Sequence, residues 1–89
     1  MFGFTIAHVR GDSMSPRLKD GQLKLFRRRG AYCVGDIVLA SHPTYGLIIK
    51  QISALEDKLV GLRGLSLESV SETSLGQISV ENIHGRLIG

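Results

Sequence analysis

Eleven glycines punctuate the chain of 89 residues, and short runs with strand chemistry lie between them. These runs combine β-branched and aromatic residues with polar ones, often in alternation, which is typical of strands. No long amphipathic helix pattern interrupts them. We therefore predict a mostly β protein, a small curled sheet or barrel-like fold. The expected strands cover residues 4–10, 22–27, 36–41, 46–53, 58–62, 77–80 and 83–88, and the serine-rich residues 64–76 are expected to form a loop.

The length predicts a single domain, residues 1–89, with a core of modest size. The only cysteine, Cys33, allows no internal disulfide. Together with three scattered histidines, it does not make a Cys-rich zinc site. We therefore expect neither a metal nor a cofactor.

The chain carries no recognisable membrane or export signal. No apolar run approaches the roughly 18–20 residues that span a bilayer. The first ten residues, MFGFTIAHVR, lack both the basic start and the long apolar stretch of a signal peptide. A lone cysteine also fits a reducing compartment. We expect a cytoplasmic protein with no membrane span.

Ser13 lies in the segment GDSMSP, residues 11–16, between a Gly-Asp turn and a turn limited by proline. At such a junction the backbone can expose a hydroxyl and leave neighbouring N–H groups unpaired. A nucleophile and an oxyanion hole need these parts. Taken alone, the segment is better explained by a serine in an ordinary turn.

Lys50 lies within the most strand-like segment, GLIIKQIS, residues 46–53. Strand alternation places it on the same face as Ile48 and Ile52. A lysine on an apolar face either extends to water at the sheet edge or is desolvated, which lowers its pKa. In the second case the neutral amine can deprotonate a serine near neutral pH.

Three segments, taken in order, resemble the serine–lysine peptidases, which include the type I signal peptidases and the LexA-type self-cleaving repressors. The segments are GDSMSPRLKDG (residues 11–21), GDIVLA (residues 35–40) and IIKQI (residues 48–52). Residues 76–89 resemble the closing segment of these peptidases, which ends in GR and apolar residues, here GRLI. The resemblance covers nearly the whole chain and implies a β-rich peptidase fold of the signal peptidase/LexA-like type.

The resemblance also implies the roles of individual residues. It makes Ser13 the nucleophile and Lys50 the general base of a Ser–Lys dyad. The oxyanion turn comprises Gly11, Asp12 and Ser13, with the N–H of Ser13 itself as the donor. Signal peptidases add a hydroxyl two residues before the nucleophile, where this chain has Gly11. The residues expected to shape the substrate groove are Met14 and Pro16.

A fourth block of the family supports the lysine and usually reads GDN followed by SxDSR. Counted back from Gly76, Ser69 falls at the position of the lysine-orienting serine. Ser71 and Thr73 replace the aspartate and the arginine, so the supporting ion pair is missing from residues 64–73.

Among the serine–lysine peptidases, a chain of this size without a membrane span most resembles the maturation proteases of nickel-type superoxide dismutase. That resemblance implies an endopeptidase that removes a short N-terminal leader from a precursor protein. Only twelve residues precede Ser13, and they contain no Ala-Gly bond of the kind that self-cleaving repressors cut. We therefore expect the precursor to be cleaved in trans.

An alternative function is favoured by the altered residues 64–73 and by the missing hydroxyl at Gly11, and its surface follows from the uneven distribution of charge. Residues 1–50 carry a net charge of +5 and residues 51–89 a net charge of −2. Within the basic half, Arg27, Arg28 and Arg29 follow Phe26. A non-catalytic β-module of the same fold could bind a protein or a nucleic acid through this cluster. The simpler explanation of the cluster is a solvated hairpin end, and for the peptidase no nucleic-acid partner is expected.

Overall fold

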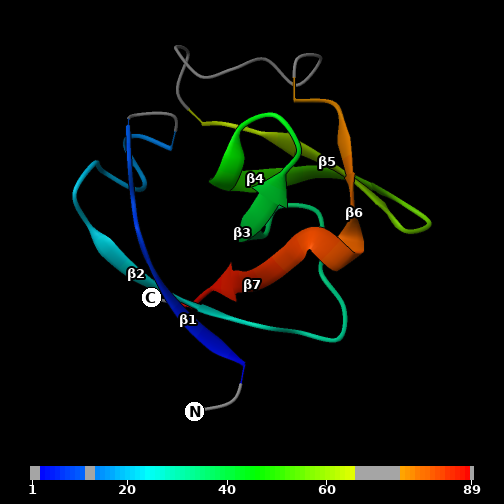
Figure 1. Ribbon diagram of the computed structural model, residues 1–89, viewed down its shortest axis with the longest axis horizontal. Helices are drawn as coiled ribbons and strands as arrows, with labels where there is room; N and C mark the ends of the chain where they lie inside the picture. Colours follow the sequence, from blue (N-terminus) through cyan, green and yellow to red (C-terminus); the bar gives the residue numbers. More distant parts are fainter. Residues whose placement is uncertain (1–2, 12–13, 66–74, 89) are drawn as a thin grey trace.

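The computed structural model describes residues 3–11, 14–65 and 75–88. Its strands form one curled antiparallel sheet with the order β1-β2-β7-β3-β4-β5-β6 (Figure 1). Within the described residues, no helix has the length and apolar character needed to cross a membrane. The elements are β1 (Phe4–His8), β2 (Leu23–Arg27), β3 (Ile37–His42), β4 (Gly46–Glu56), β5 (Leu59–Arg63), β6 (Gln77–Ser79), the 3-10 turn η1 (Val80–Asn82) and β7 (Ile83–Leu87).

The mostly β fold and all seven expected strands are confirmed, and one of them is longer than predicted. The strand β4 continues to Glu56, three residues beyond the expected end at Ser53. The pairing with β5 explains the extension, because Leu55 lies opposite Val60 and Glu56 opposite Leu59. The register shifts between Ile52 and Ala54, so a bulge separates the two halves of the strand.

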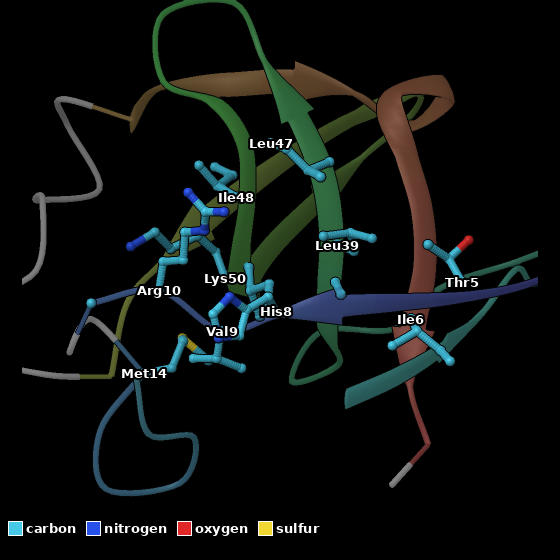
Figure 2. Close-up of a pocket in the computed structure, with 13 residues that line it drawn as sticks. Thr5, Ile6, His8, Val9, Arg10, Met14, Leu39, Leu47, Ile48 and Lys50 are labelled. Atoms are coloured by element: carbon cyan, nitrogen blue, oxygen red, sulfur yellow. The ribbon is translucent and has the colours of Figure 1, made fainter. Parts of the chain in front are cut away.

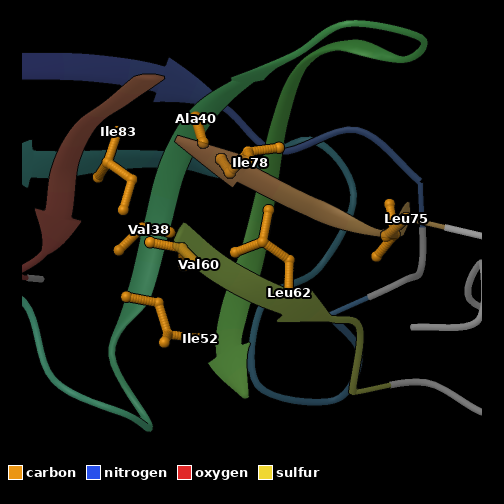
Figure 3. Packing of buried hydrophobic residues seen from close by; sticks show 8 residues of the cluster. All are labelled: Val38, Ala40, Ile52, Val60, Leu62, Leu75, Ile78 and Ile83. Carbon is orange, nitrogen blue, oxygen red and sulfur yellow. The ribbon is translucent and has the colours of Figure 1, made fainter. Parts of the chain in front are cut away.

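The central strand β3 is buried on both of its faces. Its residues from Ile37 to Ala40 are all buried, although successive side chains point to opposite sides of the sheet. One side packs into the larger apolar cluster, which joins β3 to β4, β5, β6 and β7 (Figure 3). That cluster consists of Val38, Ala40, Ile52, Val60, Leu62, Leu75, Ile78 and Ile83.

The opposite side of β3 packs against the first part of the chain. Ile37 contacts a cluster with Val9, Met14 and Leu18, and Leu39 contacts Ala7 and Phe26. The curl of the sheet therefore brings β1 and the described residues that follow it against β3 and β4. This arrangement places the residues before and after Ser13 beside the strand that carries Lys50.

The pairing of β4 is divided between its two neighbours. Residues Gly46 to Gln51 pair with β3, whereas Gln51 to Glu56 pair with β5. Within the described part of the chain, the first half of β4 thus has a strand on one side only. The strand β1 stands at the end of the sheet and pairs with β2 alone. These two strand edges, of β1 and of the first half of β4, are consequently open to a further strand.

The closing GR dipeptide, Gly85 and Arg86, has a structural explanation. A Cβ atom at Gly85 would lie 3.0 Å from the Cβ of Phe26 and 3.1 Å from the backbone of Arg27, so only glycine lets β7 approach β2 this closely. The Nη1 of Arg86 lies 3.7 Å from Oδ1 of Asp36, which precedes β3. The second Asp36 oxygen accepts a hydrogen bond of 2.8 Å from the N–H of Cys33.

We predict that Gly85→Ala lowers the free energy of unfolding by about 1–3 kcal/mol, because the added methyl group overpacks the contact with Phe26. Gly30→Ala is the matched control, since no atom lies within 4 Å of its added Cβ, and it should change stability by less than about 0.5 kcal/mol. Urea denaturation of both variants measures the difference. Equal stability of the two variants would contradict the packing argument.

Candidate active site

An open cavity of about 440 Å³ lies between β1 and the unpaired half of β4 (Figure 2). Its volume is within the range of ligand-binding pockets. Both of these strand edges border it, and Gly11 and Met14 from the loop that follows β1 also line it. The cavity is lined by Thr5, Ile6, Ala7, His8, Val9, Arg10, Gly11, Met14, Leu39, Leu47, Ile48, Ile49 and Lys50.

Lys50 lies in the middle of β4, opposite Val38, and its side chain is only 7% exposed. It shares its face with Ile48 and the buried Ile52, as strand alternation predicts. Burial disfavours the charged ammonium and lowers the pKa of Lys50 from its ordinary value of 10.5. Of the two arrangements open to a lysine on this face, the structure therefore has the desolvated one.

Backbone hydrogen bonds hold together the two ends of the loop that contains Ser13. The N–H of Val9 donates to the carbonyl of Gln22 over 2.8 Å, and the N–H of Gly21 donates to the carbonyl of Val9 over 2.9 Å. Asp20 adds a third bond, because its Oδ1 accepts from the N–H of Gly11 over 2.8 Å. The loop thus starts and ends at a fixed place beside the cavity.

The residues on either side of the Asp12–Ser13 dipeptide both line the cavity. Gly11 is at its mouth, with a φ of +77° that strongly favours glycine. Met14 is 2% exposed and packs against Val9, Leu18 and Ile37.

Not all of the expected site residues can be placed in this cavity. Asp12, Ser13 and Ser69 lie outside the described residues. Met14 and Lys50 line one cavity together, whereas Pro16 is exposed and is not among the lining residues. In the described ranges, no three His, Cys, Asp or Glu side chains are grouped so that they could hold a metal ion.

The sequence analysis did not assign two cavity residues, His8 at the end of β1 and Arg10 in the segment that follows it. Both are exposed, whereas their neighbours Ala7 and Val9 are buried, so Ile6, His8 and Arg10 project to the same side of the strand. The strand pattern of residues 4–10 already indicated that these three side chains share one side. It does not, however, reveal which other strand this side faces.

The other described basic and imidazole side chains are not among the lining residues of this cavity, but Arg28 and His84 line a neighbouring pocket that shares Thr5, Leu39 and Leu47 with it. Arg27, whose guanidinium carbon lies 5.4 Å from the centre of the Phe4 ring, is exposed like Arg28 and Arg29. The Nε2–H of the buried His42 donates to the carbonyl of Leu75 over 2.6 Å, and its Nδ1 accepts from the N–H of Thr44 over 3.0 Å. We interpret that histidine as structural, because it ties the turn after β3 to the start of β6.

Comparison with known proteins relates nearly the whole chain to one family. A family model described as Peptidase S24-like matches residues 3–87. The match includes the loop at Gly11 and Met14, the strand with Lys50, and the closing residues Gly85 and Arg86. No curated protein and no solved structure matches the chain.

The burial of Lys50 leads to a prediction about how the stability of the protein depends on pH. Because its pKa is lowered in the folded chain, the unfolded chain binds more protons between that lowered pKa and 10.5, so stability should rise with pH across this window. Lys50→Met removes the cost of the buried charge. It should therefore be more stable than the wild type at neutral pH, by about 1.4 kcal/mol for each unit of pKa lowering.

Urea denaturation between neutral and alkaline pH tests this prediction. The rise in the free energy of unfolding with pH should be absent from Lys50→Met. It should be present in Lys58→Met, where the substituted lysine is exposed. Identical pH profiles for the wild type and Lys50→Met would show that burial costs Lys50 nothing.

Proposed function

Because the chain belongs to the Peptidase S24-like family, we propose that it is a serine endopeptidase with Ser13 as nucleophile and Lys50 as general base. The observation that carries this proposal is the buried amine of Lys50 in the cavity that Gly11 and Met14 also line. A neutral amine is the form that accepts a proton, and the lowered pKa increases its share at neutral pH.

The reaction follows from these two groups. The Oγ atom of Ser13 attacks the carbonyl carbon of the scissile peptide bond while Lys50 takes the hydroxyl proton. The resulting ammonium of Lys50 gives that proton to the leaving amine, and an acyl-enzyme forms. Lys50, neutral again, then deprotonates a water molecule that attacks the ester carbonyl. The C–O bond to Ser13 breaks, the acid product is released, and the Lys50 ammonium returns the proton to the Oγ atom of Ser13.

The oxyanion of this reaction has few donors. The N–H of Gly11 is bonded to Asp20, and Gly11 has no side-chain hydroxyl. As the resemblance to the serine–lysine peptidases implies, we assign the donor role to the N–H of Ser13. Loss of one oxyanion donor costs about 10²–10³ in rate in well-studied peptidases. The enzyme should accordingly be slower than a signal peptidase.

The substrate we propose is a precursor protein with an N-terminal leader, cleaved in trans in the cytoplasm. The open edges of β1 and of the first half of β4 support an extended substrate, because each can add a strand. The resemblance to the maturation proteases makes the precursor of nickel superoxide dismutase the first candidate. We propose that residues 1–89 act as one peptidase domain and need no cofactor.

Cleavage of that precursor tests the dyad. Wild-type protein should release the leader, whereas Ser13→Ala and Lys50→Ala should cut at least about 10³-fold more slowly, because each removes a reacting group. Lys58→Ala serves as the control at an exposed lysine and should retain the wild-type rate. Mass spectrometry of the products gives the rate and the cut site.

The pH dependence provides a further check on the same reaction. The wild-type rate should rise as pH increases through the lowered pKa of Lys50 and then level off, since only the neutral amine is a base. Equal cleavage by the wild type and both dyad variants would refute the mechanism. No cleavage by any of them would favour the non-catalytic module.

Asp20 should support activity only by holding the loop before Ser13 in position. Asp20→Ala removes the acceptor of the Gly11 N–H and loosens the loop before Ser13, so we predict about a tenfold or greater fall in kcat. Asp20→Asn keeps an oxygen at the same place and should retain most of the rate. If Asp20→Asn falls as far as Asp20→Ala, the charge of Asp20 matters more than the hydrogen bond.

A further inference from the structure

The cavity has an unbalanced set of charges. Its described lining includes the basic residues His8, Arg10 and Lys50 and no aspartate or glutamate. Lys50 is buried, and burial favours its neutral form, so it contributes less charge than its residue type indicates. Arg10 is exposed and carries a guanidinium group, which makes it the main fixed charge of the cavity.

We infer that Arg10 selects substrates with an acidic side chain close to the scissile bond. This inference rests on the peptidase function proposed above and specifies its substrate. Arg10 comes three residues before Ser13 in the sequence, so its partner should lie within a few residues of the cut. The guanidinium presents several N–H donors in a plane that matches a carboxylate.

The apolar part of the cavity determines which side chains should accompany the acidic residue in the substrate. Ile6 and Leu47 line the same space and are 69% and 62% exposed, respectively. Ile6 and Arg10 project to one side of the first strand and its continuation. Since a strand added at this edge has the same period of two, its acidic and apolar side chains should be separated by an even number of positions.

A peptide fits this cavity better than a nucleic acid does. Two strand edges offer backbone hydrogen bonds to an extended chain. The described lining contains no Phe, Tyr or Trp on which a base could stack. The net charge of +5 on residues 1–50 would also speed association with an acidic peptide.

Paired peptide series test the inference. One series moves a single Asp along an extended Ala/Val/Leu peptide, and the other places Asn at the same positions. Binding is measured by fluorescence anisotropy with Ser13→Ala protein, which should not cut the peptides, and cleavage is followed separately with the wild type. Asp at one register should bind about three- to tenfold more tightly than Asn, and high salt should reduce this difference.

Variants of Arg10 test whether the preference for Asp over Asn arises from Arg10. Arg10→Gln should abolish the Asp preference, and Arg10→Lys, which keeps the charge, should retain part of it. Arg17→Gln is the control at an exposed arginine outside the cavity lining and should retain all of it. Thermal melting checks that each variant folds.

The outcomes separate this inference from the proposed function. Cleavage without an Asp preference, or a preference that survives Arg10→Gln, would overturn the role of Arg10 and leave the peptidase intact. An Asp preference without cleavage would support Arg10 and contradict the peptidase. Absence of binding to every peptide would overturn the role of Arg10.

Discussion

The divided pairing of β4 is the constraint on which the site depends. Its second half is held by β5, and its first half has β3 on one side and the cavity on the other. Lys50 comes at the end of that first half, directly before the point where β5 begins to pair. The lysine is therefore deep enough to be desolvated and still borders a space that a substrate can enter.

A chain of 89 residues has few ways to hold a buried amine, and the motif residues provide much of the support. Gly85 lets β7 pack closely on β2, and Asp36 joins the start of β3 to Arg86 of β7. Asp36 of the dipeptide Gly35-Asp36 and both residues of the dipeptide Gly85-Arg86 thus contribute to the scaffold. The chemistry that we propose depends on Ser13 and Lys50 alone, with Asp20 keeping the loop in place.

Much of this structure could be predicted from the sequence, because strand signals are local. Glycine spacing and alternation predicted all seven strands, and alternation also gave the face of Lys50. Local signals could not decide whether Lys50 reaches water, since its burial depends on the fold around it, where Val9 and Met14, about forty residues away, line the same cavity. For the same reason the sequence analysis did not assign Arg10 to the site. The extension of β4 depended on a bulge that the pattern does not mark.

The most direct test of the account is a side-chain NMR titration of Lys50 in the folded wild-type protein. The account predicts that the amine loses its proton at a pH well below the ordinary value of 10.5, because burial penalises the charged form. Titration at the ordinary value would contradict it, since Lys50 would then be a solvated ammonium and could not serve as the base for Ser13.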